Sequence, residues 1–237
     1  MLSACSSGDA QTADTEISAD NITVSETETS SDSVTVSETE TVPETTSAVI
    51  CTTEPVHETY SDYRDAYRAK LIEMREDEYG AHTAFDLFDM DSDGIPELFA
   101  SYADIHFAGA CIFTFKDGEL LPLSCADEND PSEETNIFGS WGQVNASSDG
   151  YISSELCGQG TSMTTFFRFD GRNVEKIADT EHGRGWGAGE YFMLNGEDVS
   201  EEEFNAVFDE CSAHDWVTLG RGNNADDETI EKVIYGE

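Results

Sequence analysis

Aromatic side chains are confined to one part of this chain, and this uneven distribution limits where a folded core can form. All 24 Phe, Trp and Tyr residues lie at or beyond Tyr60, and all 11 Lys and Arg residues lie at or beyond Arg64. The 51 residues from Ser6 to Val56 include 21 Ser or Thr, and the segment Thr23–Thr29 recurs word for word at Thr35–Thr41. Such a segment buries too little apolar surface to offset its chain entropy, and its acids repel one another. We therefore predict a disordered Ser/Thr/Glu-rich stalk over residues 6–56.

The rest of the chain, residues 57–237, has the composition of one folded domain. These 181 residues contain every aromatic side chain, together with 40 acidic and 11 basic residues. That aromatic content is enough for one packed hydrophobic core. We expect a single globular domain over this range.

The chain carries a large excess of negative charge. It has 51 Asp and Glu against 11 Lys and Arg, a formal net charge of −40. Contacts to nucleic-acid phosphates need clustered Lys and Arg side chains, and electrostatic binding to anionic lipid needs them too. We therefore expect no nucleic acid among the partners of this protein.

The first five residues follow the pattern of a bacterial lipoprotein signal. Leu2-Ser3-Ala4-Cys5 resembles the lipobox, in which an apolar residue and two small residues precede a Cys that becomes diacylated. The charged and apolar regions that normally precede a lipobox are missing, so residues 1–5 correspond to its remnant. Two or more acyl chains anchor a protein stably. The resemblance implies an acylated Cys5 and an extracytoplasmic location, lipid-anchored to the cell membrane of a bacterium.

Apolar periodicity predicts helices at both ends of the domain. The N-terminal helix is predicted from the apolar positions Tyr60, Tyr63, Tyr67, Leu71 and Met74. Thr59 or Ser61 is expected as its N-cap. Ser200 and Glu203 have the spacing of a capping box at the start of a second helix. A short C-terminal helix is expected over residues 227–234.

Between these helices, short apolar runs alternate with residue pairs that favour tight turns. The pairs are Asp117-Gly118, Asp149-Gly150, Asp170-Gly171 and Asn195-Gly196. Strands are predicted over residues 111–115, 120–124, 141–145, 151–156, 164–169 and 174–178. The segments Ile112–Gly118 and Phe166–Gly171 look alike, as one hairpin unit used twice. We predict the α+β class: a twisted antiparallel β-meander of propeller-blade-like hairpins, with the N-terminal and C-terminal helices packed against it.

A disulfide between Cys111 and Cys125 is open from the sequence but not favoured. A two-residue turn at Asp117-Gly118 would place Cys111 opposite Ser124. Cys125 would then point to the other side of the sheet, because successive side chains of a strand alternate between its faces.

The sharpest chemical motif is the segment from Asp89 to Leu98, Asp-Met-Asp-Ser-Asp-Gly-Ile-Pro-Glu-Leu. Carboxylates at loop positions 1, 3 and 5 can surround one hard cation, and a Gly at position 6 permits the sharp turn. Position 7 offers its backbone carbonyl and position 9 a fourth acid. The predicted metal ligands are Asp89, Asp91, Asp93, the carbonyl of Ile95, and Glu97. The predicted cofactor is Ca²⁺, with a structural role.

This segment differs from an EF-hand. An EF-hand needs a bidentate acid at position 12, where this chain has Ala100, and Pro96 is unsuited to an exiting helix. Residues 98–100 instead favour a strand. The segment resembles the calcium loops of FG-GAP and VCBS-type propeller repeats, D-x-D-x-D-G-x-x-[DE]-L, which imply Asp89, Asp91, Asp93 and Glu97 as ligands. Since only one such loop is present, a full propeller is not implied.

More broadly, the chain resembles an uncharacterised family of surface lipoproteins from Gram-positive gut bacteria. That family combines an N-terminal helix, one D-x-D-x-D-G-I-P-E-L loop and a late segment that corresponds to Tyr191–Phe204. The resemblance covers residues 57 to about 215. It implies a calcium-binding domain displayed at the cell surface.

Other residues give weaker indications of function. None of the five His residues lies in a metalloprotease or nucleophile-elbow motif, and no Cys spacing indicates zinc. Trp186, in a Gly-rich loop, is a candidate for stacking on a sugar face. The preferred hypothesis is a calcium-stabilised, non-catalytic binding or structural domain with a glycan or protein ligand. Two alternatives stay open: an extracytoplasmic hydrolase acting on glycan or peptide, and a protein-interaction module of a surface complex.

Overall fold

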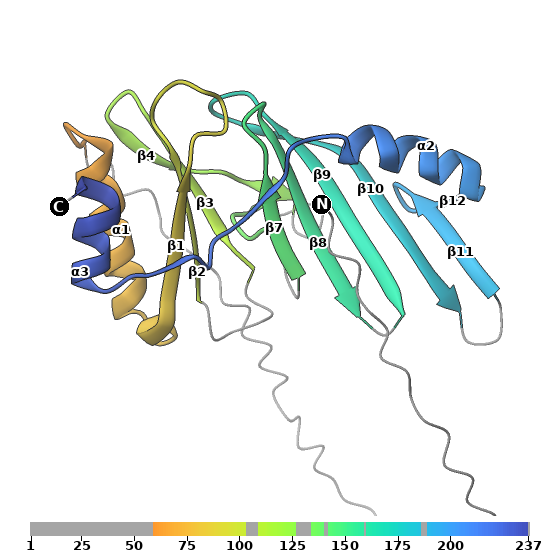
Figure 1. Ribbon diagram of the computed structural model, residues 1–237, viewed down its shortest axis with the longest axis horizontal. Coiled ribbons are helices and arrows are strands. Elements are labelled where there is room, and N and C mark those ends of the chain that lie inside the picture. The colour runs from red at the N-terminus through yellow and green to blue at the C-terminus, as the bar shows by residue number, and fades with distance from the viewer. Residues whose placement is uncertain are drawn as a thin grey trace, which may run out of the picture. The chain divides into compact units, whose positions relative to one another are not determined.

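Two antiparallel sheets lie at the centre of the fold, and helices cover their outer faces (Figure 1). The computed structural model describes residues 59–102, 109–126, 134–139, 142–158, 160–185 and 189–236. The predicted α+β class with antiparallel hairpins and flanking helices is confirmed. The meander is divided between two larger sheets, because its hydrophobic strand faces pack against each other.

The first sheet has five strands, in the order β14-β1-β2-β3-β4. Its strands are β1 (Thr83–Phe88), β2 (Glu97–Tyr102), β3 (Cys111–Lys116), β4 (Glu119–Pro122) and β14 (Asn223–Asn224). The turn between β3 and β4 pairs Lys116 with Glu119. Its two central residues, Asp117 and Gly118, have φ angles of 54° and 82°. This is the two-residue hairpin that the sequence predicts.

The second sheet has seven strands, in the order β12-β11-β10-β9-β8-β7-β13. Its strands are β7 (Gly142–Ala146), β8 (Tyr151–Gly158), β9 (Thr161–Phe169), β10 (Val174–Gly185), β11 (Gly189–Leu194), β12 (Glu197–Asp198) and β13 (Val217–Leu219). A two-stranded sheet joins β5 (Cys125–Ala126) to β6 (Glu134–Thr135). Strand β10 extends well past the predicted range because it pairs with β9 on one side and β11 on the other.

Helix α1 (Tyr63–Glu76) begins later than the apolar spacing suggests. Its N-cap is Asp62, whose carboxylate accepts a hydrogen bond from the Arg64 amide, so the prediction of Thr59 or Ser61 was wrong. Tyr60 instead donates its backbone N–H to the Gly118 carbonyl at 2.8 Å. The chain is therefore held by the β3–β4 turn before it enters the helix. A 3₁₀ helix, η1 (Gly80–His82), leads into β1.

The C-terminal helices are α2 (Glu201–Ser212) and α3 (Asp227–Ile230), the latter continued by the π-helical turn η2 (Glu231–Tyr235). The capping box is confirmed: Ser200 accepts from the Glu203 amide, and the Glu203 carboxylate accepts from the Ser200 amide. Among the helices in the part of the chain that the structure describes, none is long and apolar enough to cross a membrane.

Side chains alternate between the two faces of each strand, and this alternation produces a layered core. On β1, β2 and β3, Phe85, Leu98 and Phe113 face α1 and α3. Their neighbours Phe99 and Ile112 face the other way and pack with residues of the second sheet. The outer face of the second sheet is covered by α2 through an aromatic cluster of Phe166, His182, Phe192, Phe204 and Phe208.

The two cysteines weighed for a disulfide lie on opposite sides of the first sheet. Cys111 packs in the cluster that faces the helices, whereas Cys125 packs against the cluster between the sheets. Their packing in different clusters agrees with the prediction that Cys111 and Cys125 point to different sides.

Candidate metal centre

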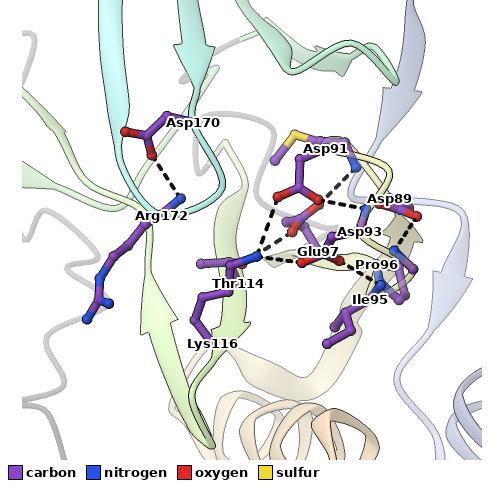
Figure 2. Close-up of polar contacts among 12 residues, drawn as sticks. Asp89, Asp91, Asp93, Ile95, Pro96, Glu97, Thr114, Lys116, Asp170 and Arg172 are labelled. Carbon is purple, nitrogen blue, oxygen red and sulfur yellow. Dashed lines mark hydrogen bonds and ion pairs between the residues drawn. The ribbon is translucent and has the colours of Figure 1, made fainter.

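The Asp-rich motif forms the loop between β1 and β2, at one end of the space between the two sheets (Figure 2). Its sharp turn uses two positive φ angles, 59° at Ser92 and 88° at Gly94. Glycine adopts such an angle without a steric penalty, which agrees with its place at position 6. Strand β2 begins at Glu97, so the predicted loop-to-strand arrangement is confirmed.

Three hydrogen bonds from backbone amides hold the aspartates of the loop. The Gly94 amide donates to Asp89 Oδ2 at 3.1 Å, and the Asp93 amide donates to Asp91 Oδ1 at 3.2 Å. The Ile95 amide donates to Asp93 Oδ1 at 2.8 Å. These bonds fix where the carboxylates point before any ion arrives.

Asp89, Asp91 and Glu97 form a cluster of acids that could hold a metal ion. One ligand oxygen from each lies within 4.8 Å of the others. Asp89 Oδ1 is buried and accepts no hydrogen bond within the described residues. A buried, unpaired carboxylate oxygen is costly unless a donor or a cation satisfies it. The donor set therefore fits a hard, oxygen-seeking cation.

Glu97 is the most deeply buried of these acids, with 2% of its surface exposed. It lies on the face of β2 that points toward the second sheet. Its carboxylate accepts hydrogen bonds from the Met90 amide at 2.9 Å and from the Thr114 hydroxyl at 3.2 Å. Burial, together with the nearby charge of Asp91, raises the pKa of Glu97 from 4.5 to about 7. A bound cation would favour its ionised form.

Asp93 lies outside the cluster and is paired with Lys116 at the end of β3. Lys116 Nζ is 2.5 Å from Asp93 Oδ2 and 3.6 Å from Asp91 Oδ2, and Figure 2 shows the lysine extending between them. Partial burial by itself would raise the pKa of Asp93. The hydrogen bonds from Lys116 and Ile95 outweigh this effect and bring that pKa below its usual value. The bond to Asp93 correspondingly raises the pKa of Lys116.

The loop also contacts turns of the second sheet. Ser92 Oγ donates to the Ser148 carbonyl at 3.4 Å, in the turn between β7 and β8. The turn between β9 and β10 approaches so closely that a Cβ at Gly171 would lie 2.8 Å from Asp91 Oδ2. This turn is the one that carries Asp170 and Arg172 in Figure 2. The acids therefore lie where the two sheets meet.

The other predicted site residues have different positions. Ile95 is half-buried against the core that faces the helices, and its amide supports Asp93. The carbonyl of the next residue, Pro96, accepts a hydrogen bond from Tyr67 at 2.7 Å, which ties the loop to α1. Cys5, Trp186 and the stalk predicted over residues 6–56 lie outside the described residues.

Two residues that reach the site from β3, Lys116 and Thr114, were not predicted from the sequence. A signal for the lysine does exist, because Lys116 is the one Lys or Arg between Arg75 and Arg168. The proximity of Lys116 to the loop depends on strand pairing, which a local sequence motif does not reveal.

A second polar arrangement involves His214, which follows the end of α2. His214 Nδ1 lies 2.9 Å from Asp149 Oδ2, and its ring stacks on Tyr151 with centroids 3.8 Å apart. Ser147 donates to Asp149 rather than to His214. The three residues therefore lack the contact between nucleophile and base that nucleophilic catalysis needs. They join the end of α2 to the hairpin of β7 and β8.

No family model, curated protein or solved structure matches this chain. What can be stated of the site therefore comes from its own geometry.

Proposed function

We propose that this protein is a cell-surface lipoprotein whose calcium-stabilised domain has a non-catalytic binding or structural role. In this proposal Cys5 carries the lipid anchor, residues 6–56 form the stalk, and the cation is Ca²⁺. The observation that carries it is the acidic cluster, with its orphaned Asp89 oxygen, at the junction of the two sheets.

Calcium is the favoured ion because of the type and number of ligands. The loop offers carboxylates at positions 1, 3, 5 and 9 and a backbone carbonyl at position 7, all of them oxygen donors. Ca²⁺ takes six to eight such oxygens and tolerates irregular geometry, whereas Mg²⁺ keeps most of its water. Nitrogen or sulfur ligands, which would favour zinc, are not part of the cluster.

The proposed role of calcium is to stabilise the contact between the two sheets. The loop belongs to the first sheet, yet Ser92 contacts the β7–β8 turn and Asp91 contacts the β9–β10 turn. Without a cation, the acids at this junction repel one another. Neutralising them strengthens the contact between sheets that are far apart in the sequence.

A cavity supports the binding part of the proposal. It has a volume of about 270 Å³ and opens on the side of the second sheet that faces away from α2. Its apolar lining includes Leu156, Met163, Phe167 and Met193, with Glu181 among its polar groups. A cavity of this size accepts a small ligand or a side chain of a partner, such as the predicted glycan or protein.

The test is thermal unfolding of the full chain with 2 mM Ca²⁺ and with EGTA. We expect calcium to raise the unfolding temperature of the wild type and to lose that effect in Asp91→Asn. Asp117→Asn is the matched control, because it removes an exposed acid from the neighbouring turn without touching the cluster. An unfolding temperature that is the same in calcium and EGTA would contradict the metal assignment.

A further inference from the structure

Lys116 occupies a special place relative to the proposed calcium ligands. Its ammonium lies 2.5 Å from Asp93 Oδ2 and 3.6 Å from Asp91 Oδ2. Asp91 belongs to the acidic cluster, whereas Asp93, although at loop position 5, does not. Asp93 therefore differs from the other three acids in two respects: it lies outside the cluster, and it makes the shorter ion pair with Lys116.

We propose that Lys116 is an internal counter-ion that competes with calcium for Asp93 and so sets the concentration at which the site fills. This inference rests on the proposed function. In the metal-free protein the ammonium supplies part of the positive charge that the loop needs. When calcium binds, Asp93 must exchange Lys116 for the ion.

The charges explain why this exchange weakens binding. Asp89, Asp91, Asp93 and Glu97 bring four carboxylates to the loop, and Lys116 brings one ammonium. The ammonium reduces the attraction that an incoming cation feels, and it lies close enough to repel that cation directly. Calcium sites are tuned over several orders of magnitude by such changes in charge and rigidity.

The position of Lys116 suits this role. It is the last residue of β3, directly before the tight Asp117-Gly118 turn, so its backbone is fixed by pairing with Glu119. Its side chain is 30% exposed. The long lysine stem can therefore turn toward solvent when the ion arrives, without moving the strand.

The consequence is a site adapted to high calcium. Extracellular calcium modules bind at roughly 0.1–1 mM. A competing ammonium weakens calcium binding to a four-carboxylate loop and so shifts it toward that range. It also stabilises the loop when calcium is absent.

The experiment measures calcium affinity by isothermal titration calorimetry and metal-free unfolding temperature in EGTA, using the full chain. For Lys116→Gln we expect opposite changes in the two quantities. Calcium should bind about two- to fivefold more tightly, the range that partly exposed ion pairs give. The metal-free protein should unfold at a lower temperature, because four acids are left without their counter-ion.

Two further variants make the result specific. Lys176→Gln removes a similar pair, with Nζ 2.5 Å from Asp179 Oδ2 on β10, and should leave calcium affinity unchanged. Lys116→Arg keeps the charge and should bind calcium within about twofold of the wild type. If Lys116→Gln folds only with calcium present, its unfolding in EGTA is the expected loss of metal-free stability. Its calcium affinity is then measured from the calcium dependence of folding.

The failure of this inference can be told apart from the failure of the proposed function. A wild type that does not bind calcium overturns both, and Lys116 is then the permanent counter-ion of the loop. A wild type that binds calcium, with unchanged or weaker affinity in Lys116→Gln, overturns only the competition. A tighter calcium affinity in Lys116→Arg would also overturn only the competition.

Discussion

At the scale of single residues, Glu97 shows how burial and charge oppose each other in this site. Its side chain is 2% exposed, and it accepts hydrogen bonds from two neutral donors, the Met90 amide and the Thr114 hydroxyl. Burial therefore raises its pKa from 4.5 to about 7. An acid whose pKa is raised in the folded state stabilises that state below the unfolded pKa, and this stability is lost as pH rises through the folded pKa.

This predicts the pH dependence of the metal-free protein. In EGTA, the free energy of unfolding of the wild type should fall relative to that of Glu97→Gln between pH 4.5 and about 7. A shift of this size corresponds to roughly 2–4 kcal/mol above pH 7. Glu97→Gln should therefore be the more stable protein at pH 8 in EGTA, yet gain less from calcium. Urea unfolding at several pH values, with and without calcium, measures both effects.

Glu155 provides the matched control for this comparison. It is a half-buried acid on β8, hydrogen-bonded by Asn145 at 2.9 Å, and burial raises its pKa as well. Glu155→Gln should also stabilise the protein at pH 8 but keep the full response to calcium. An equal loss of that response in both variants would show that Glu97 has no particular link to the ion.

At the scale of elements, the connection from β13 to β14 carries the chain from the second sheet back to the first. Asp86 on β1 holds this connection, because its Oδ2 accepts hydrogen bonds from the amides of Gly220, Arg221 and Gly222 at 2.7–3.0 Å. Asn223 adds a bond to Oδ1 at 3.1 Å. A carboxylate that satisfies three consecutive amides fixes the path of this segment.

Removal of this carboxylate should destabilise the fold. We expect Asp86→Ala to lower the free energy of unfolding by about 2–3 kcal/mol, because bonds to a charged group are lost and amides are left unpaired. Calcium should still raise its stability, since Asp86 is not part of the acidic cluster. The exposed Asp215 is the control, and Asp215→Ala should unfold like the wild type in urea. Equal stability of Asp86→Ala and the wild type would contradict the prediction.

At the scale of the whole domain, the proposed metal site and the Asp86 connection both join the two sheets. Between them lies the core of Phe99, Ile112, Ile152 and Phe167. Helix α1 contacts the loop through Tyr67, whereas α2 packs through Phe204 on the face of the second sheet that points away from the junction. The effect of calcium should therefore spread across the sheets and spare α2.

Hydrogen–deuterium exchange tests this spread. Calcium should slow exchange in the loop of residues 89–97 and also in the second-sheet turns at residues 147–150 and 170–173. Exchange in α2 should stay the same, because this helix packs through Phe204 on the far face of its sheet. Protection confined to residues 89–97 would mean that the ion orders its own loop without joining the sheets.

Much of the fold was predictable because its signals are local. The capping box, the hairpin turns and the alternation along β3 each depend on residues a few positions apart, and the structure confirms them. The N-cap of α1 was missed because a tertiary contact, from Tyr60 to Gly118, delays the helix. The division into two sheets was also missed, since it depends on which strand faces pack together.

The sequence by itself determined the loop: its acids, its glycine and the strand that follows lie within ten residues, and local geometry places them. Only the tertiary structure decided which acids come together and what else joins them. Thr114 reaches Glu97 across 17 positions, Lys116 reaches Asp93 across 23, and Ser92 reaches Ser148 across 56. Contacts over such separations depend on strand register and sheet packing, which no short pattern encodes. Burial raised the pKa of Glu97, and strand pairing brought a lysine to Asp93, so the tertiary structure set the electrostatics of a loop whose acids were already fixed by the sequence.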